Sequence, residues 1–312
     1  MRKPVSALLL CLILALALQT VGLAQQMVPL SFKFAPGDTV QYDVTISGSA
    51  SLMATGNHVT PVTIRGSASL LQAVTQAFPD GSGRIETRIP SGEFTITFDK
   101  DQVKLIYANN QVRWYANGKE SSPPQGDLST IPFIGTPLVY TMMPTGLVKD
   151  VAIADPRLMN EMTKTLPQFD FAAMQSMGES VFPDKPVAVG ETWRDTKTIA
   201  PMGPQYPITV SSSRTLDSYT DTGGIGLAKI VGSRDARFNG MPPTSLPGQN
   251  VSVAISDIRH TMNSTEFFNT TSGRLMRGDY DVVFSAQVSV NAGGQQKGGG
   301  IQARLRVNVQ SR

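Results

Sequence analysis

The chain has 312 residues, of which 40% are hydrophobic and 16% charged, with a single cysteine and a formal net charge of +3. One cysteine excludes an intramolecular disulfide framework and a thiolate metal site. The small charge excess gives no basis for binding nucleic acid or an anionic membrane.

The first 24 residues are typical of a secretory signal peptide. Arg2 and Lys3 form a positively charged start, and residues 8–18 are almost wholly apolar. Gly22 and Ala24 then place small residues before a cleavage site that follows Ala24. The apolar run is too short to span a bilayer, and no later run approaches the length of a membrane helix. We therefore expect an exported protein, periplasmic or extracellular, with no transmembrane segment in the mature chain.

Cleavage changes the charge and cysteine content of the mature protein. The whole chain carries 27 Lys and Arg against 24 Asp and Glu, so loss of Arg2 and Lys3 leaves 25 against 24. Cys11, the only cysteine, is lost with them. The mature protein is nearly neutral, and we expect no nucleic-acid partner. Without disulfides its stability must come from a hydrophobic core, which a chain of this length can build.

Alternating polar and apolar residues predict two long strands at the start of the mature chain. Residues 39–52 alternate with period two, and a second run over 62–70 follows a turn signal at Gly56-Asn57. Both runs contain Gly-Ser-Ala-Ser-Leu, beginning at Gly48 and at Gly66. A hairpin centred on Asn57 would place these glycines opposite each other, at a sharp bend of the sheet.

Shorter strand signals continue from there to residue 153. The pair Leu70-Leu71 breaks the alternation and predicts a bulge. Asn109-Asn110 lies between two apolar runs and predicts a tight hairpin. Further short strands are predicted at 138–143 and 147–153. We assign residues 25–153 to an N-terminal β half.

A helical segment is predicted over residues 154–181. Asp155 is a good N-cap, and Pro156 suits the first helical position. Apolar residues then recur at helical spacing up to Leu166. Pro167 should end this helix, and residues 169–177 predict a second short one.

Methionines are concentrated in this helical segment. The spacing Met-x-x-Met, at 159–162 and again at 174–177, resembles thioether sites for Cu(I). Because no histidine or cysteine clusters with them, we interpret the methionines as flexible packing against a curved sheet and predict no metal and no other cofactor. Five residues are expected to cover the apolar face of the sheet and to line any ligand groove: Met159, Met162, Phe169, Met174 and Met177.

Long strands resume after the motif FPDKPVAVGETW at residues 182–193. A glycine, an acid, a threonine and an aromatic residue also follow one another in APGDTVQY at 35–42, which suggests two related halves. Residues 293–300 are glycine-rich and predict a flexible connection before the terminal strand. We assign 182–312 to a C-terminal β half. The predicted fold is mainly β, with long, curved antiparallel sheets in two related halves and a helical insert between them.

These motifs together resemble a family of uncharacterised secreted bacterial β-proteins. The resemblance rests on the Gly-Asp start before Tyr42, the Pro-x-Gly turn at 144–146, the motif at 182–193 and the turn TSGRL at 271–275. It covers most of the mature chain and carries no known active site. The long curved strands with a helical plug also resemble the half-barrels of lipoprotein carriers, in architecture only.

No motif in the chain indicates catalysis. His58 and His260 are the two histidines, and no G-x-S-x-G or H-E-x-x-H accompanies them. Carboxylates gather around the central motif at Glu179, Asp184, Glu191 and Asp195, where turn formation is the commoner role.

The sequence therefore predicts a protein that is not an enzyme. It would be an exported cell-envelope protein that binds an apolar or lipid-like ligand between sheet and helix. The alternative is a structural or interaction scaffold with a filled core, without a small-molecule ligand. An envelope protein is a further candidate partner.

Overall fold

A computed structural model describes residues 26–54, 58–109, 111–122, 136–158, 181–201, 203–240, 244–245, 251–292 and 295–312. The described chain is mainly β-strand, and every strand pair is antiparallel, as predicted. In chain order the strands are β1 (Met27–Val28), β2 (Thr39–Ala54), β3 (His58–Ala77), β4 (Gly83–Phe98), β5 (Asp101–Ala108), β6 (Gln111–Ala116), β7 (Lys119–Ser121), β8 (Leu138–Met142), β9 (Val148–Ile153), β10 (Val187–Ala188), β11 (Thr192–Ile199), β12 (Ile208–Thr222), β13 (Ile225–Gly240), β14 (Thr244–Ser245), β15 (Val251–Asn269), β16 (Arg274–Ala292) and β17 (Gln295–Ser311).

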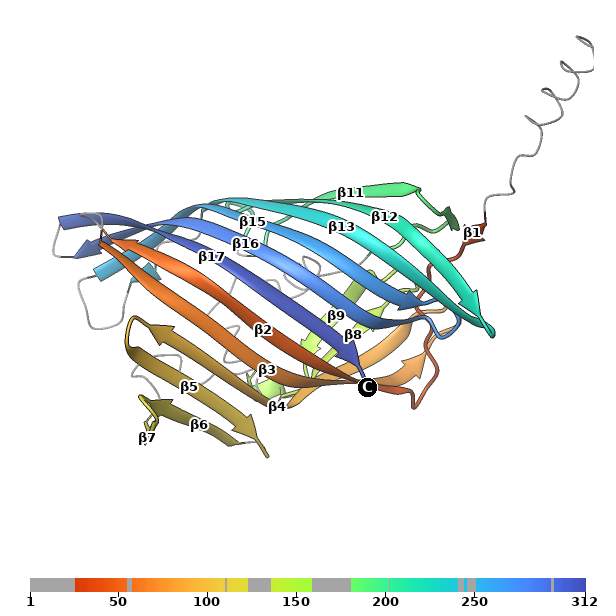
Figure 1. Cartoon of the computed structure of the whole chain (residues 1–312), viewed down its shortest axis with the longest axis horizontal. Helices are drawn as coiled ribbons and strands as arrows, with labels where there is room; N and C mark the ends of the chain where they lie inside the picture. Colours follow the sequence, from red (N-terminus) through yellow and green to blue (C-terminus); the bar gives the residue numbers. More distant parts are fainter. Residues whose placement is uncertain are drawn as a thin grey trace, which may run out of the picture.

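The two predicted halves belong to one continuous sheet (Figure 1). Strands β11 to β17 follow one another across one part of it, with the short β14 off the path, and β2 to β7 follow across the other. The last strand of the chain, β17, pairs with β2 and joins the two parts. β4 pairs with β8 along its first half and with β5 along its second, so the sheet divides there.

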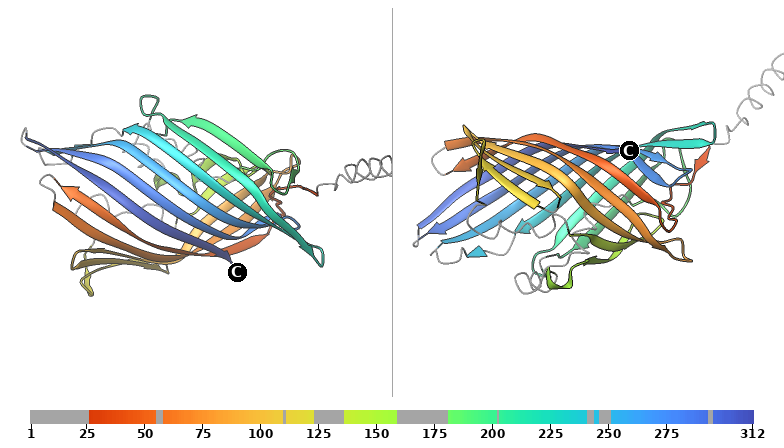
Figure 2. Two further views of the ribbon diagram at one scale, coloured as in Figure 1. Left: turned by 45° about the horizontal axis from the view of Figure 1, so that its top comes forward. Right: turned by 90° about the horizontal axis from the view of Figure 1, so that it is seen from below.

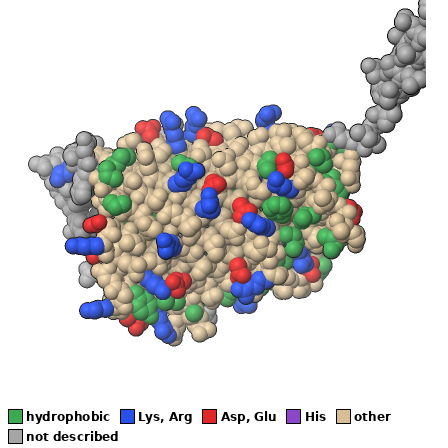
Figure 3. Space-filling model, in the orientation of Figure 1, with side chains coloured by type: hydrophobic (Ala, Val, Ile, Leu, Met, Phe, Trp, Pro, Cys, Tyr) green, Lys and Arg blue, Asp and Glu red, His purple; other side chains and the backbone are tan. Residues whose placement is uncertain are grey.

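The sheet curls around an interior, as the two views of Figure 2 show. We call the face that carries Tyr42, Ile46 and Val307 the inner face, and the face that carries Arg65 and Arg306 the outer face. Side chains alternate between these faces because successive strand residues point to opposite sides. Charged side chains lie scattered among other polar ones over the outer face (Figure 3).

The β2–β3 hairpin is confirmed, but its register differs from the predicted one by two residues. Ile46 lies opposite Gly66 and Gly48 opposite Ile64, which centres the hairpin on residue 56. Register depends on contacts with the outer neighbours as well as on the turn. A side chain at Gly48 would fall against the backbone of Leu305 in β17, and one at Gly66 against the ring of Phe94 in β4. Gly48 thus allows a close approach of β17 on one side of the hairpin, and Gly66 allows a close approach of Phe94 on the other.

Two other local predictions have opposite outcomes. The bulge at Leu70-Leu71 is confirmed, because the register between β3 and β4 shifts between Ser69 and Leu71. The flexible connection at 293–300 is wrong over its described part, since residues 295–300 form the start of β17 and pair with β16. Strand pairing on both sides holds this glycine-rich stretch extended despite its low intrinsic preference for strands.

The helical insert is not supported by the described residues. Of the range 154–181, the structure describes 154–158 and Val181, with a single helical turn at 156–158. The predicted N-cap does begin this turn, because Arg157 N donates to Asp155 Oδ1 at 2.8 Å. Residues 159–180 lie outside the described part of the chain.

One end of the curled sheet is covered by the segment of residues 26–38. Its β1 pairs with β10, Phe32 N donates to Pro144 O at 2.8 Å, and Lys33 N donates to Gly273 O at 3.4 Å. Phe32 stacks on Phe182 at 5.2 Å between ring centroids, and Phe268 meets Phe182 edge-on at 4.9 Å. The rings of Phe182 and Phe268 belong to a core cluster at this end, and Phe32 packs against it. We call this end the closed end, and its cluster comprises Val28, Leu30, Phe182, Val187, Leu216, Ala228, Ile230 and Phe268.

The two halves begin with the same turn. Gly37 N donates to Val74 O at 2.9 Å, and Gly190 N donates to Leu216 O at 2.7 Å. The carbonyl of the acid that follows each glycine accepts a hydrogen bond back from the same partner residue, at 2.8 and 3.1 Å. Both glycines have positive φ, 86° and 87°, which suits a residue without Cβ. The similarity between the motifs at 35–42 and 182–193 therefore corresponds to equal backbone geometry.

Candidate functional site

The residues predicted from sequence to bind a ligand lie outside the described residues: Met159, Met162, Phe169, Met174 and Met177. The structure does describe where the chain re-enters the fold after them. The carbonyl of Val181 accepts a hydrogen bond from Trp193 Nε1 at 3.0 Å and one from Arg214 Nη1 at 3.4 Å. The C-terminal end of that segment is thus held against the inner face of β11 and β12.

The inner face of β17, β2, β3 and β4 is apolar and only half-buried. Small side chains recur along it, at Gly48, Ala50, Gly66, Ala68 and Ala303, and leave the wall shallow. By contrast, the described core clusters lie at the closed end, around Ile85 on β4, β8 and β9, and around Ile208 on β12 and β13. The larger half-buried apolar residues of this wall are Val44, Ile46, Ile64, Phe94, Ile96, Leu305 and Val307.

Charged side chains are buried on the inner face of the other half. Arg214 on β12 is 4% exposed, Arg234 on β13 is 7% exposed and Glu266 on β15 is 2% exposed. Ser264 and Tyr280 lie on the same face, on the neighbouring strands β15 and β16. We call these five residues the polar band. It crosses the face between the closed-end cluster and the cluster of Ile208, Val210 and Ala236.

Two glycines make room for the polar band. A Cβ on Gly232 would lie 2.9 Å from Ser264 Oγ and 3.0 Å from Arg214 Cγ, so the arginine stem lies over this glycine. A Cβ on Gly278 would lie 2.5 Å from Tyr280 Oη, so the tyrosine ring lies over that glycine. Cβ atoms at these distances would collide with both side chains.

The electrostatics of the polar band hold Tyr280 neutral. Burial, followed by the charge of Glu266, raises the pKa of Tyr280 far above its ordinary value, while Arg214 and Arg234 oppose this. The Tyr280 hydroxyl therefore lies within electrostatic reach of all three buried charges of the band. As a neutral hydroxyl it can both donate and accept a hydrogen bond.

His260 lies one row further from the closed end, between Ala236 and Phe284. Burial and the positive charge of Arg234 lower its pKa, so the ring is neutral at pH 7. Its Nδ1 atom is buried and has no hydrogen-bond partner among the described residues. Buried polar atoms without partners are rare in folded proteins.

A second polar group lies on the inner face near the start of β2. Tyr140 Oη is 3.0 Å from both Gln72 Nε2 and Thr87 Oγ1. Burial, and then the proximity of Tyr140, raises the pKa of Tyr42 to about 12. A cavity of about 60 Å³ lies beside it, and the ion-paired side chains of Arg274 and Asp38 form part of its lining. This volume holds a water molecule or two but no lipid-like ligand.

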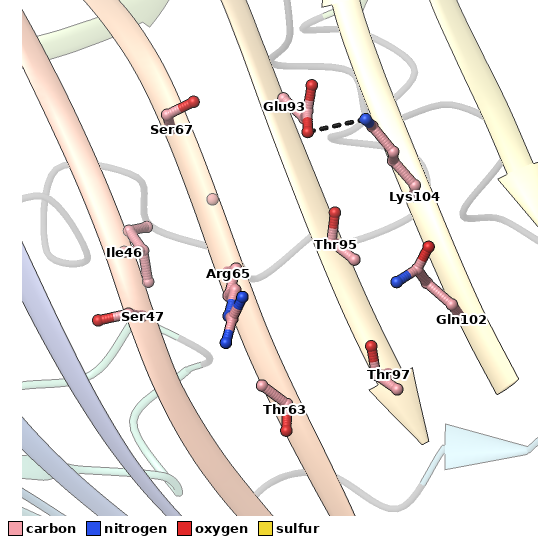
Figure 4. Close-up of a pocket in the computed structure, with 11 residues that line it drawn as sticks. Ile46, Ser47, Thr63, Arg65, Ser67, Glu93, Thr95, Thr97, Gln102 and Lys104 are labelled. Carbon is pink, nitrogen blue, oxygen red and sulfur yellow. Dashed lines mark ion pairs between the residues drawn. The ribbon is translucent and has the colours of Figure 1, made fainter. Parts of the chain in front are cut away.

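A groove of about 750 Å³ runs along the outer face over β2 to β5 (Figure 4). Glu93 Oε1 and Lys104 Nζ form an ion pair across it at 2.8 Å. The other polar side chains of the groove point from neighbouring strands: Ser47, Thr63, Arg65, Ser67, Thr95, Thr97 and Gln102. Ile46 and Gly66 adjoin the groove although they belong to the inner face, and the outer-face side chains that line it are all polar or charged, so it suits water and polar solutes.

The carboxylates considered for acid–base chemistry do not form a described site. Glu191 has a turn role, because its Oε2 accepts a hydrogen bond from Ala188 N at 2.8 Å. Asp184 is exposed, Asp195 lies on the inner face of β11, and Glu179 is outside the described residues. Within the described ranges no group of three His, Cys, Asp or Glu could hold a metal ion. No helix in this part of the chain is long and apolar enough to cross a membrane.

Sequence reasoning missed the polar band, although the signal was present. Arg214 and Arg234 stand at positions of β12 and β13 where period two predicts inward, apolar side chains. Glu266 likewise interrupts the inward positions of β15. Charged residues at inward positions are expensive to bury and so point to a specific role.

Comparisons with known proteins do not assign this chain to a family. No family model matches the chain, and no curated protein matches it. OccK5 (OpdH) of Pseudomonas aeruginosa is 8% identical over 89% of this chain and 100% of its own, with a TM-score of 0.24. An outer membrane channel from Pseudomonas putida F1 is 10% identical over 91% of this chain and 100% of its own, with a TM-score of 0.21. Scores this low carry no argument about fold or function.

Proposed function

We propose that this is an exported, non-catalytic protein of the cell envelope that holds an apolar, lipid-like ligand against the inner face of its sheet. The observation that carries the proposal is the half-buried apolar wall of β17, β2, β3 and β4, with its small residues. A continuous apolar surface left partly exposed on a curved face is a typical binding surface for apolar ligands. The signal-peptide features of residues 1–24 support export to the periplasm or beyond.

The outer face supports a protein that works in water. It carries arginines on four strands, Arg65, Arg237, Arg259 and Arg306, among serines and threonines. An arginine on a lipid-facing sheet position costs about 2–4 kcal/mol at the middle of a bilayer. The apolar side chains face inward instead, where a carried ligand would be shielded from water.

Titration of the purified mature protein with a fluorescent fatty-acid analogue tests the proposal. We expect saturable binding that unlabelled fatty acid displaces, and native mass spectrometry should show lipid that co-purifies with the protein. A flat titration with a lipid-free native spectrum would contradict the proposal.

Two variants on one strand locate the ligand. Ala303→Trp places a large ring on the inner wall of β17, opposite Ala50, and should reduce binding strongly because it fills the space that the small residues leave. Gln302→Trp places the same ring on the outer face one residue away and should leave binding unchanged. If both variants bind the probe equally well, the ligand does not bind at the inner face.

A scaffold with a filled core is the second candidate, and one observation favours it. The closed end is packed by stacked and edge-on phenylalanines around Phe182, in a cluster of buried apolar side chains. If this packing extended over the whole inner face, neither the unmodified protein nor the two tryptophan variants would bind the probe. Ala303→Trp would also be strongly destabilised. The protein would then act through its surface, for example on another envelope protein.

A further inference from the structure

We propose that the outer face over β16, β17 and β2 to β5 binds an acidic polysaccharide, through arginines without an acidic partner and the hydroxyl groups between them. This inference goes beyond the proposed function, because it assigns a second ligand to the opposite face of the sheet. The site joins two hollows: the groove of about 750 Å³ over β2 to β5, and one of about 240 Å³ over β16, β17 and β2. Ser47 lines both, so the two hollows adjoin.

The charge of the lining is the first argument. The described charged residues that line the two hollows are four cations, Arg65, Lys104, Arg304 and Arg306, and two carboxylates, Glu93 and Asp281. Lys104 pairs with Glu93 at 2.8 Å, and Arg306 Nε lies 3.3 Å from Asp281 Oδ1. Arg65 and Arg304 are exposed, and no described carboxylate pairs with either. The described lining therefore carries two net positive charges, which an anionic ligand would complement.

The arrangement of the cations across the strands is the second argument (Figure 4). Arg306 on β17 lies opposite Ser47 on β2, which lies opposite Arg65 on β3. Arg65 lies opposite Thr95 on β4, which lies opposite Lys104 on β5. Cations thus recur on every second strand, about 9–10 Å apart, with a hydroxyl side chain on each strand between them. A chain laid across the strands would meet this alternation if it carried an acidic group on every second unit.

The polar side chains around this row are the third argument. Hydroxyl and amide groups both donate and accept hydrogen bonds, as the hydroxyls of a sugar do. Within the described part of the chain, these side chains have no hydrogen-bond partner, so they are available to a ligand. The uncharged polar residues of the two hollows are Ser47, Ser49, Thr63, Ser67, Thr95, Thr97 and Gln102.

The density of charge favours a polysaccharide over a nucleic acid. A nucleic acid carries a phosphate on every nucleotide, and single strands are bound by stacking their bases on aromatic side chains. No aromatic residue is among the described residues that line the hollows, and Glu93 and Asp281 would repel closely spaced phosphates. A polysaccharide with one acidic group for every second sugar has fewer charges and many hydroxyls, as this lining requires.

Binding of matched oligosaccharides to the purified mature protein is the decisive experiment. A hyaluronan oligosaccharide, with a carboxylate on every second sugar, is compared by calorimetry with a neutral dextran oligosaccharide of equal length. A single-stranded oligonucleotide and vesicles of phosphatidylglycerol are the other probes. We expect hyaluronan to bind about tenfold or more tightly than dextran at about 50 mM salt. Its affinity should fall several-fold at about 500 mM salt, because exposed charges are screened.

Each other outcome would overturn the inference. If neither oligosaccharide binds, or if both bind equally, the arginines do not select an acidic sugar chain. If the oligonucleotide or the vesicles bind more tightly than hyaluronan, the outer face serves a nucleic acid or a membrane instead. An affinity for hyaluronan that salt leaves unchanged would contradict contact through exposed arginines. The fatty-acid titration is a separate test, since it concerns the inner face.

Three arginine variants locate the site. Arg65→Gln and Arg304→Gln should each lower the affinity for hyaluronan several-fold, and Arg65→Lys should lower it less, because it keeps the charge without the guanidinium fork. Arg194→Gln is the matched control, since Arg194 is exposed on the outer face of β11, at the far end of the strand order, and no described carboxylate pairs with it. This control should bind like the unmodified protein. Equal losses in all three glutamine variants would reflect net charge alone and would contradict the site, as would full affinity in Arg65→Gln.

Discussion

Gly48 gives the sharpest test of how the inner wall is built. A Cβ at this position would point at the carbonyl oxygen of Arg304 and would lie 2.9 Å from Leu305 Cα and 2.7 Å from Leu305 Cδ2. Two of these atoms belong to the backbone of the paired strand β17, so they cannot rotate away. Gly48→Ala must therefore move β2 or β17, which overpacks the wall.

The expected change in the free energy of unfolding results from two opposing effects. Replacing glycine by alanine at a compatible strand position stabilises the fold by about 0.4–1 kcal/mol, because the unfolded chain loses freedom. Overpacking typically costs about 1–3 kcal/mol, and the backbone contacts place Gly48 in the upper part of this range. We expect Gly48→Ala to lower the free energy of unfolding by about 1–2 kcal/mol. Gly66→Ala should lower it less, because the atoms it meets nearest belong to the Phe94 side chain.

Gly298 on β17 provides the matched control. A Cβ there has no heavy atom within 4 Å, and its φ is not positive. Gly298→Ala should therefore be neutral or stabilising by up to about 1 kcal/mol. Urea unfolding of the three variants, followed by tryptophan fluorescence and analysed with a common m-value, measures the differences. Equal midpoints for Gly48→Ala and Gly298→Ala would refute the close approach of β2 and β17 at Gly48.

Three further predictions concern pH and the closed end. The pKa of His260 is lowered in the folded state, so the unfolded chain takes up the proton first, and stability should fall as the pH drops below about 6.5. In His260→Gln the thermal midpoint should decline less between neutral and acid pH. An unchanged decline in this variant would contradict the role of His260. Burial raises the pKa of Tyr42 to about 12, so stability should be lost as the pH rises from 10 toward that value, by about 2–3 kcal/mol in all. Urea titrations of Tyr42→Phe should show a smaller loss over this pH range. An equally steep loss in the variant would mean that another group causes it. Gly273 has φ 66° and touches Lys33, whereas Gly223 has φ 62° and open space around it. Gly273→Ala should therefore lower the free energy of unfolding by about 1–3 kcal/mol more than Gly223→Ala. Equal losses would mean that the segment of residues 26–38 does not depend on this contact.

Much of the local structure could be predicted because a strand shows its two faces in its own sequence. The alternation of residues 39–52 identified β2, and the alternation of 62–70 identified β3. The turn glycines and the bulge at Leu70-Leu71 were also recognisable, since each results from the conformational preferences of one or two residues. The relation between the halves remains a prediction, which the shared turns at Gly37 and Gly190 support.

The candidate site could be predicted only in part. The preference of the inner face for apolar residues came from the strand pattern, and so did the expectation of an apolar ligand. The predicted methionine lining lies outside the described residues and stays a prediction. The polar band was missed, because Arg214, Arg234 and Glu266 are separated by tens of residues and meet only through the pairing of β12, β13 and β15.

The sequence by itself determined which stretches form strands and which side chains share a face, while the export signal at residues 1–24 stays a prediction. These features depend on near neighbours, whose geometry repeats every two residues in a strand. Only the tertiary structure decided that β17 pairs with β2, that the hairpin is centred on residue 56, and that the glycine-rich residues 295–300 are extended. It also decided that two arginines and a glutamate converge between two apolar clusters. The physical reason is that register and strand order are set by contacts between residues distant in the chain, which no local pattern encodes.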